Sequence, residues 1–384
     1  MISNHIARRL VDADLLEVVA SATSSKIPLK EDFLKGMLSG LEGRSGIQAP
    51  IAWESAYKKL QANPQLAPIA LQIAQQFGSA SAAKELLAVV RNTQAAAEQR
   101  KEAISSLAGN KRQELVTELP QLIEQSAVRS EAIRAIAAFD EGSLGELLLK
   151  KYKTFTLSEK QEAIQTLAAR PAYGWRLAGA LKDKIIPRKD IPPYIALQLK
   201  RVVGNGFVEI WGPIDEVDTD IQADFAKYQR LLSDKAVAAA NPQNGRFVFQ
   251  RTCWSCHKMY EDGGNLGPDL TGSNRANVGY LLSNVLDPSG ELQDDYKMVV
   301  LTTQDGRTIS GNIIAESDRQ LTLRTVSQDG VVLNKSDIQT REQTEKSIMP
   351  EGLLTTLTEE EVLDLMAYMR TTAQVDLEAA VVND

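Results

Sequence analysis

The chain has 384 residues, of which 43% are hydrophobic and 24% are charged, and its formal net charge at pH 7 is −7. A chain of this length and composition can form two domains that each bury a substantial core. Residues 245–384 carry 12 basic and 22 acidic side chains, whereas residues 1–244 carry 31 and 28, so the acidic excess of the C-terminal part argues against nucleic-acid binding.

The N-terminal segment lacks the features of a targeting signal. Residues 1–9, MISNHIARR, have no apolar segment of the kind found in signal peptides. The sequence contains no run of 18 apolar residues, so it predicts no membrane-spanning helix. Ile6, Leu10 and Leu15 are typical of the middle of a helix, so we expect this chain to be part of a longer protein.

One pattern recurs in the first half of the chain. Residues 102–108, 131–137 and 162–168 read EAISSLA, EAIRAIA and EAIQTLA, and weaker copies begin near Ile69 and Ile195. Self-similarity at intervals of about 30 residues predicts a solenoid of helix pairs. The pattern resembles HEAT-like repeats and also fits other arrays of paired helices. A solenoid of this kind usually serves as a scaffold or binding surface.

This pattern sets the expected domain boundaries of the first half. We predict a helical-repeat domain over residues 1–204 and a helical linker over residues 205–244.

Both cysteines and one of the two histidines lie in residues 253–257, CWSCH. This is the spacing of a covalent c-type haem site, in which Cys253 and Cys256 tether the haem and His257 binds the iron. A thiol redox couple is an alternative, but it would be expected between a strand and a helix. A zinc site would need further ligands, for which only His5 remains among Cys and His. A disulfide would close a very short loop and constrain little of the unfolded chain.

A second iron ligand is predicted at Met349, in residues 347–353, SIMPEGL. A thioether on this proline-containing loop would give, with His257, the His/Met pair that raises the potential of a c-type haem. The alternative is that Met349 only fills a gap in the core. The helix predicted over residues 359–370 should cross an earlier helix at Gly245, where the missing side chain lets two backbones approach.

A β insertion is predicted between these two halves, from about residue 296 to residue 340. Apolar and polar residues alternate in runs that begin at Met298, Thr308, Leu321 and Val331. The pairs Asp305-Gly306 and Asp329-Gly330 are strong hairpin signals. We therefore expect a small antiparallel sheet of four or five strands, which flanks the side of the haem opposite His257.

Residues 263–272, GGNLGPDLTG, resemble the G-P-x-L-x-G stretch of the cytochromes c. This resemblance implies that the carbonyl of Pro268 accepts the Nδ1 proton of His257 and so orients the ring. It also implies that Arg275 binds a haem propionate, although the spacing is one residue shorter than in that family. An ordinary solvated arginine is the alternative for Arg275.

The ordered motifs between residues 205 and 372 resemble the haem-binding domain of planctomycetes and verrucomicrobia. They are Trp211-Gly212, Gly245-Arg246 with Phe249, residues 253–257, residues 267–272, Leu286-Asp287-Pro288-Ser289, Tyr296, Asp305-Gly306 with Gly311, and residues 347–353. In that family the domain forms the C-terminal end of large secreted or membrane-associated proteins, often behind propellers that resemble sugar dehydrogenases. The present sequence contains no propeller, so the resemblance does not imply a dehydrogenase activity of its own.

The predicted fold is mainly α, with a HEAT-like solenoid followed by a class I cytochrome c-like domain over residues 245–375 and a tail over residues 376–384. The leading hypothesis is a monohaem c-type cytochrome that holds one haem c through Cys253 and Cys256, with His257 and Met349 as iron ligands. Its expected partner is a redox protein or a dehydrogenase module, fused or separate, and not a nucleic acid. Because cytochromes c receive their haem outside the bacterial cytoplasm, we expect a periplasmic or extracytoplasmic location.

Two other functions stay open at this stage. The chain could be a haem-based sensor or an interaction scaffold, in which the iron exchanges one ligand for a small gas. A peroxidase is less well supported, because His5 is the only other histidine available as a distal acid or base. By itself the chain is expected to be an electron carrier and not an enzyme.

Overall fold

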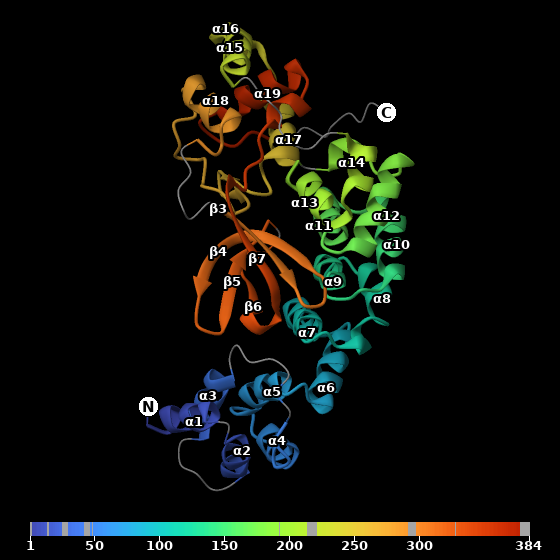
Figure 1. Cartoon of the computed structure of the whole chain (residues 1–384), viewed down its shortest axis with the longest axis vertical. Coiled ribbons are helices and arrows are strands. Elements are labelled where there is room, and N and C mark those ends of the chain that lie inside the picture. The colour runs from blue at the N-terminus through green and yellow to red at the C-terminus, as the bar shows by residue number, and fades with distance from the viewer. Residues whose placement is uncertain are drawn as a thin grey trace. The chain divides into compact units, whose positions relative to one another are not determined.

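The computed structural model describes residues 2–13, 15–24, 30–41, 47, 49–191, 193–212, 221–290, 297–326 and 328–376. The chain is mainly helical and contains a small antiparallel sheet (Figure 1), which confirms the predicted fold class at this level. It divides into two compact units. The first comprises residues 1–166, 316–321 and 332–338, and the second comprises residues 167–315, 322–331 and 339–384. The boundary that the repeats predict at residue 204 therefore does not coincide with the boundary between the units.

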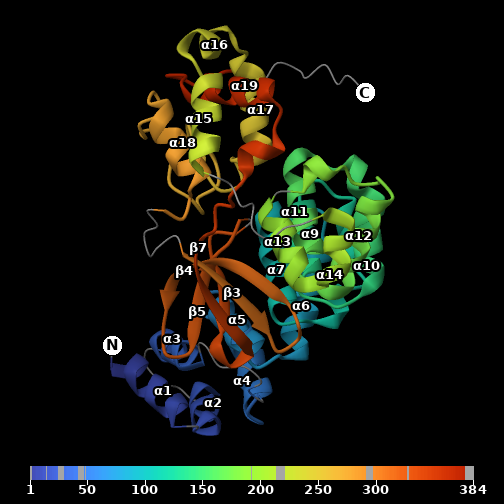
Figure 2. The same ribbon diagram turned by 45° about the horizontal axis from the view of Figure 1, so that its top comes forward.

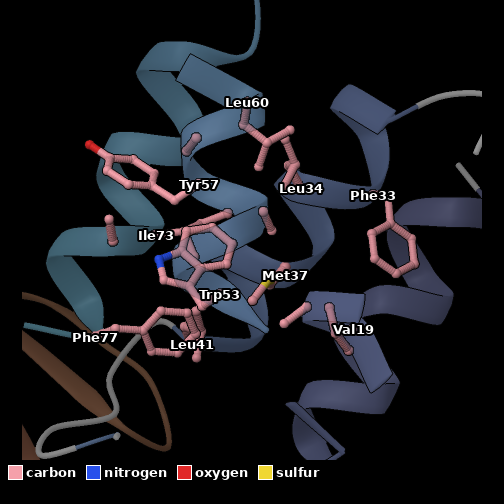
Figure 3. Close-up of a cluster of buried hydrophobic side chains, with 14 of the residues drawn as sticks. Val19, Phe33, Leu34, Met37, Leu41, Trp53, Tyr57, Leu60, Ile73 and Phe77 are labelled. Atoms are coloured by element: carbon pink, nitrogen blue, oxygen red, sulfur yellow. The ribbon is translucent and has the colours of Figure 1, made fainter. Parts of the chain in front are cut away.

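The N-terminal helices share one apolar core. They are α1 (Ile2–Asp12), α2 (Leu16–Ser24), α3 (Lys30–Leu41), α4 (Trp53–Gln61), α5 (Ala67–Gln76) and α6 (Ala80–Arg91). Figure 3 shows the ring of Trp53 among Tyr57, Phe77 and Leu41. The Trp53 ring stacks on Tyr57 with centroids 6.0 Å apart and meets Phe77 edge-on at 5.2 Å. Aromatic burial of this kind supplies much of the stability of a small helical core.

The repeated segments fall on every second helix of this part of the chain. These are α7 (Ala97–Gly109), α9 (Arg129–Ile136) and α11 (Leu157–Leu167), with the weaker copy at Ile195 in α13 (Pro193–Val203). The helices between and after them are α8 (Leu119–Ile123), α10 (Gly142–Lys151), α12 (Pro171–Lys182) and α14 (Asn205–Trp211). Equivalent residues of the pattern are buried in each copy, for example Ile104, Ile133 and Ile164. The repeat in the sequence therefore reflects the burial of the same positions in α7, α9 and α11.

A second helical core surrounds the CWSCH segment. It is formed by α15 (Ile221–Leu231), α16 (Asp234–Ala239), α17 (Pro242–Thr252), α18 (Val278–Leu286) and α19 (Glu359–Met369), which Figure 2 shows gathered together. Tyr228, Leu232 and Val237 are buried in this core. The described part of the expected linker is helical, but α15 and α16 pack as part of this body, whereas α14 packs against α12 and α13.

The helices α17 and α19 cross in close contact. A methyl group at Gly245 would overlap the main-chain carbonyl of Asp364, and Phe249 meets Tyr368 edge-on at 5.4 Å. The crossing predicted at Gly245 is therefore confirmed. The start of α19 is fixed by a capping box, in which Thr358 and Glu361 satisfy each other's backbone N–H groups.

The sheet has five strands in the order β6-β5-β4-β3-β7. They are β3 (Lys297–Thr303), β4 (Thr308–Glu316), β5 (Gln320–Arg324), β6 (Val331–Asn334) and β7 (Ile338–Ser347). The β3–β4 hairpin turns at Gly306, whose φ of 78° requires a glycine-like conformation. The sheet extends past the predicted end at residue 340, to Ser347 at the end of β7. The prediction stopped too early because this edge strand consists mostly of polar residues and shows no apolar alternation. The predicted beginning at Tyr296 lies outside the described residues.

Candidate functional site

The CWSCH segment continues the last turn of α17. The N–H of Cys253 donates to the carbonyl of Phe249 at 2.8 Å, and the N–H of His257 donates to the carbonyl of Cys253 at 2.9 Å. These turn-like hydrogen bonds keep Cys253, Cys256 and His257 within one compact segment. The two cysteines are free and form no disulfide with each other.

A short hairpin follows the segment, formed by β1 (Lys258–Met259) and β2 (Asp262–Gly263). Its turn residues Tyr260 and Glu261 have φ angles of 54° and 66°, in the left-handed region. This conformation costs roughly 1–2 kcal/mol for each residue other than glycine. Tyr260 is held there by a hydrogen bond from its N–H to Thr271 Oγ1 at 2.8 Å, so the loop after the hairpin stabilises the turn.

Three glycines let the next loop lie directly on the CWSCH segment. A methyl group at Gly263 would overlap the His257 carbonyl, and one at Gly264 would overlap the Ser255 carbonyl. A Cβ at Gly267 would lie 2.5 Å from Cε1 of His257. The ring of His257 therefore packs directly against the backbone at Gly267, and any larger residue there would displace either the ring or the loop.

The imidazole of His257 is held by the carbonyl of Pro268, at 2.9 Å from Nδ1. Because a carbonyl can only accept, Nδ1 carries the proton in this contact and the lone pair of the neutral ring lies on Nε2. Burial lowers the pKa of His257 and outweighs the Pro268 carbonyl, which acts in the opposite direction. The ring is thus neutral near pH 7, with Nε2 as the nitrogen that can bind a metal.

The environment of the cysteines argues against the thiol redox alternative. Burial raises the pKa of Cys253 to about 11 and that of Cys256 to about 12. Redox-active thiols have pKa values below the ordinary one, because the thiolate is the reactive form. Among the described residues, no group of three or more His, Cys, Asp or Glu side chains is arranged to hold a metal ion.

Arg275 is buried, with 9% of its surface exposed, so the solvated-arginine alternative is wrong. Its Nη1 donates to the Met369 carbonyl at 2.6 Å and its Nη2 to the Thr271 carbonyl at 2.8 Å. The guanidinium also lies over the ring of Tyr260, 5.1 Å from its centroid. These contacts join the hairpin, the following loop and the end of α19, while the buried Nε has no hydrogen-bond partner among the described residues.

Met349 lies on its predicted loop, between β7 and the 3-10 helix η6 (Leu353–Thr356). Its side chain is half-buried, and its N–H donates to Ser347 Oγ at 3.1 Å. Cys253, Cys256, His257 and Pro268 are thus brought together by the fold, and Met349 is on the separate loop that the sequence indicates.

Two hydrogen bonds of the CWSCH segment were not predicted from the sequence. Trp254 donates its indole N–H to Asp262 at 2.7 Å, and a partner for this group could have been expected because half-buried tryptophans usually need one. Tyr194 of α13 hydrogen-bonds with Ser255, and burial followed by the nearby Cys256 thiol raises the pKa of Tyr194. No local pattern in the sequence connects Tyr194 with a segment some 60 residues away.

The β insertion contacts the loop that binds His257. Arg324 of β5 and Asp329, which precedes β6, hydrogen-bond with Asn265, three residues before Pro268. These contacts join the sheet to the loop that carries Pro268.

Comparison of the chain with protein-family models and with curated proteins finds no match, so the resemblances in the sequence stay predictions. Among the described residues, none of the helices combines the length and apolar character needed to cross a bilayer.

Proposed function

We propose that this chain is a monohaem c-type cytochrome, an electron-transfer domain joined to a HEAT-like helical scaffold. The observation that carries the proposal is the hydrogen bond between His257 Nδ1 and the Pro268 carbonyl, next to two free cysteines at the C-x-x-C-H spacing. Metal-binding histidines almost always donate their other ring N–H to a carbonyl or carboxylate, which fixes the tautomer and raises the basicity of the ligand.

The residues present fit a covalently bound haem in three respects. His257 is neutral and its Nε2 carries the lone pair. The loop at Gly267 leaves only backbone against the ring. Among the residues that the structure describes, the buried Nε of Arg275 has no hydrogen-bond partner, and a propionate carboxylate is a group that could supply one.

When bound, haem c would supply a one-electron couple between the ferric and ferrous states of its iron. Cys253 and Cys256 would tether the ring, and Nε2 of His257 would bind the iron. Pro268 orients His257, and the thioether of Met349 is proposed as the second side chain that would bind the iron. The protein would set the potential through these ligands, their hydrogen bonds and their burial.

The packing of the chain supports this assignment. The crossing of α17 and α19 at Gly245 agrees with a class I cytochrome c-like domain that carries the sheet as an insertion. The repeated burial pattern in α7, α9 and α11 agrees with a HEAT-like solenoid. The proposed electron donor is a redox protein or a dehydrogenase module, and the proposed location is periplasmic or extracytoplasmic, where c-type haem is attached.

The proposal is tested by producing the chain together with a c-type haem maturation system. We expect a reduced-minus-oxidised spectrum and a pyridine haemochrome that correspond to one haem per chain. A variant with Cys253→Ala and Cys256→Ala should lose the covalent haem. A native chain that carries no covalent haem under these conditions would overturn the proposal. Carbon monoxide should bind slowly or not at all to the reduced protein, whereas rapid binding would favour a gas sensor.

A further inference from the structure

Asn265 connects the sheet to the loop that follows the CWSCH segment. Its main-chain carbonyl accepts a hydrogen bond from Arg324 Nη1 at 3.3 Å, and its side-chain amide donates to Asp329 Oδ1 at 3.3 Å. Arg324 ends β5 and Asp329 lies in the connection from β5 to β6. The sheet therefore holds both the main chain and the side chain of one residue in this loop.

The same short loop is fastened to the CWSCH segment on either side of Asn265. The N–H of Gly264 donates to the Trp254 carbonyl at 2.8 Å, and the N–H of Gly267 donates to the Cys256 carbonyl at 2.8 Å. The next residue is Pro268, whose carbonyl holds His257. If Asn265 is displaced, the next three residues, which end at Pro268, must accommodate the movement. The close contacts of the glycines leave this loop no space to move towards the CWSCH segment.

We propose that Asn265, Arg324 and Asp329 are positioning residues for His257, through which the β insertion sets the potential of the haem. This inference rests on the proposed function. A firm hydrogen bond from Nδ1 makes the imidazole a more basic ligand, which stabilises the ferric state. Loosening the loop weakens that bond and raises the potential.

The chemistry of the contact allows a sharp test. Asn265 presents an amide N–H to a carboxylate, so Asn265→Asp would place two carboxylates against each other and push the loop away from the sheet. Asp329→Ala removes the acceptor without adding repulsion. Asp329→Asn keeps an acceptor oxygen and serves as the conservative variant. The side chains of Asn265 and Asp329 are exposed, so these variants should fold.

The matched control is Asp318→Ala, which removes an exposed carboxylate from the β4–β5 turn of the same sheet. Two measurements are made on the haem-loaded chain. One is the midpoint potential by spectroelectrochemical titration, and the other is hydrogen exchange of the Gly267 amide, which reports directly on the loop.

In Asn265→Asp and Asp329→Ala, we expect the ratio of reduced to oxidised protein at a fixed applied potential to rise about threefold. This change is smaller than the roughly 10–100-fold loss of metal affinity or activity that follows when a group hydrogen-bonded directly to a metal ligand is removed. The Gly267 amide should exchange faster in both. Asp329→Asn and Asp318→Ala should match the native chain in both measurements. An unchanged potential in Asn265→Asp and Asp329→Ala would overturn the inference while leaving the proposed function intact. A native chain without covalent haem would instead overturn the proposed function, and Gly267 exchange would still show whether the sheet holds the loop.

Discussion

Gly245 of α17 lies directly against the main-chain carbonyl of Asp364 in α19, so that a methyl group at residue 245 would overlap the carbonyl oxygen. The backbone of Asp364 cannot rotate away as a flexible side chain could. Gly245→Ala should therefore force the two helices apart and destabilise the domain by about 1–3 kcal/mol, the usual cost of overpacking. Urea unfolding followed by circular dichroism measures this change.

The control for this substitution is Gly272→Ala in the same part of the chain. A Cβ at Gly272 would meet no atom within 4 Å. Its unfolding free energy should stay close to that of the native chain. Equal stability of the two variants would show that α17 and α19 do not depend on the close approach at Gly245.

Met349→Ala tests whether Met349 would be the second iron ligand. If the thioether binds the iron, its loss should lower the midpoint potential by more than about 59 mV, which is a tenfold change in the equilibrium for one electron. Met366→Leu is the control, because Met366 is buried in the core of α19 and should affect packing alone. An unchanged potential in Met349→Ala would exclude Met349 as a ligand.

Arg275→Lys tests the clamp at the end of α19. A lysine ammonium cannot reach the Met369 and Thr271 carbonyls at once with the geometry of the guanidinium. Leaving such a buried acceptor unpaired should cost about 1–3 kcal/mol of unfolding free energy. Arg230→Lys on the exposed face of α15 should change stability little. A variant at residue 275 as stable as the one at residue 230 would contradict the clamp.

The capping box of α19 should give stability that depends on pH. Burial alone would raise the pKa of Glu361, but the Thr358 N–H and Arg251 lower it below its ordinary value. A carboxyl whose folded pKa is lowered contributes stability that is complete above the unfolded pKa and is lost as the pH falls through the folded pKa.

The comparison for this prediction is Glu361→Gln. The native chain should be more stable than this variant above about pH 5.5, and the difference should shrink below about pH 4, near and beneath the ordinary pKa of glutamate. Urea unfolding at a series of pH values gives the difference. A difference that does not change with pH would show that the charge of Glu361 does not contribute.

Local signals in the sequence were sufficient for several features. The periodic apolar residues indicated the last helix, and Gly245 indicated where it meets α17, because a close helix crossing leaves a glycine in the sequence. The Asp305-Gly306 pair indicated the β3–β4 hairpin, because few residues adopt the left-handed conformation that its turn requires.

Other features depend on contacts that leave no local pattern. The strand β7 is polar after Ile338 and shows no alternation of apolar and polar residues, so nothing in its sequence marks it as a strand; its pairing at the edge of the sheet appears only in the fold. Tyr260 adopts a conformation that tertiary contacts impose and that its own preferences disfavour. The role of Asn265 follows from its meeting with Asp329, 64 residues later in the chain, which only the fold reveals.

The proposed function requires that Cys253 and Cys256 hold one haem covalently. Intact-mass spectrometry of the denatured chain, after production with a c-type maturation system, tests this most directly. We expect a mass increase of one haem in the native chain, and no increase when Cys253 and Cys256 are both replaced by alanine. A native chain with the mass of the polypeptide alone would contradict the account.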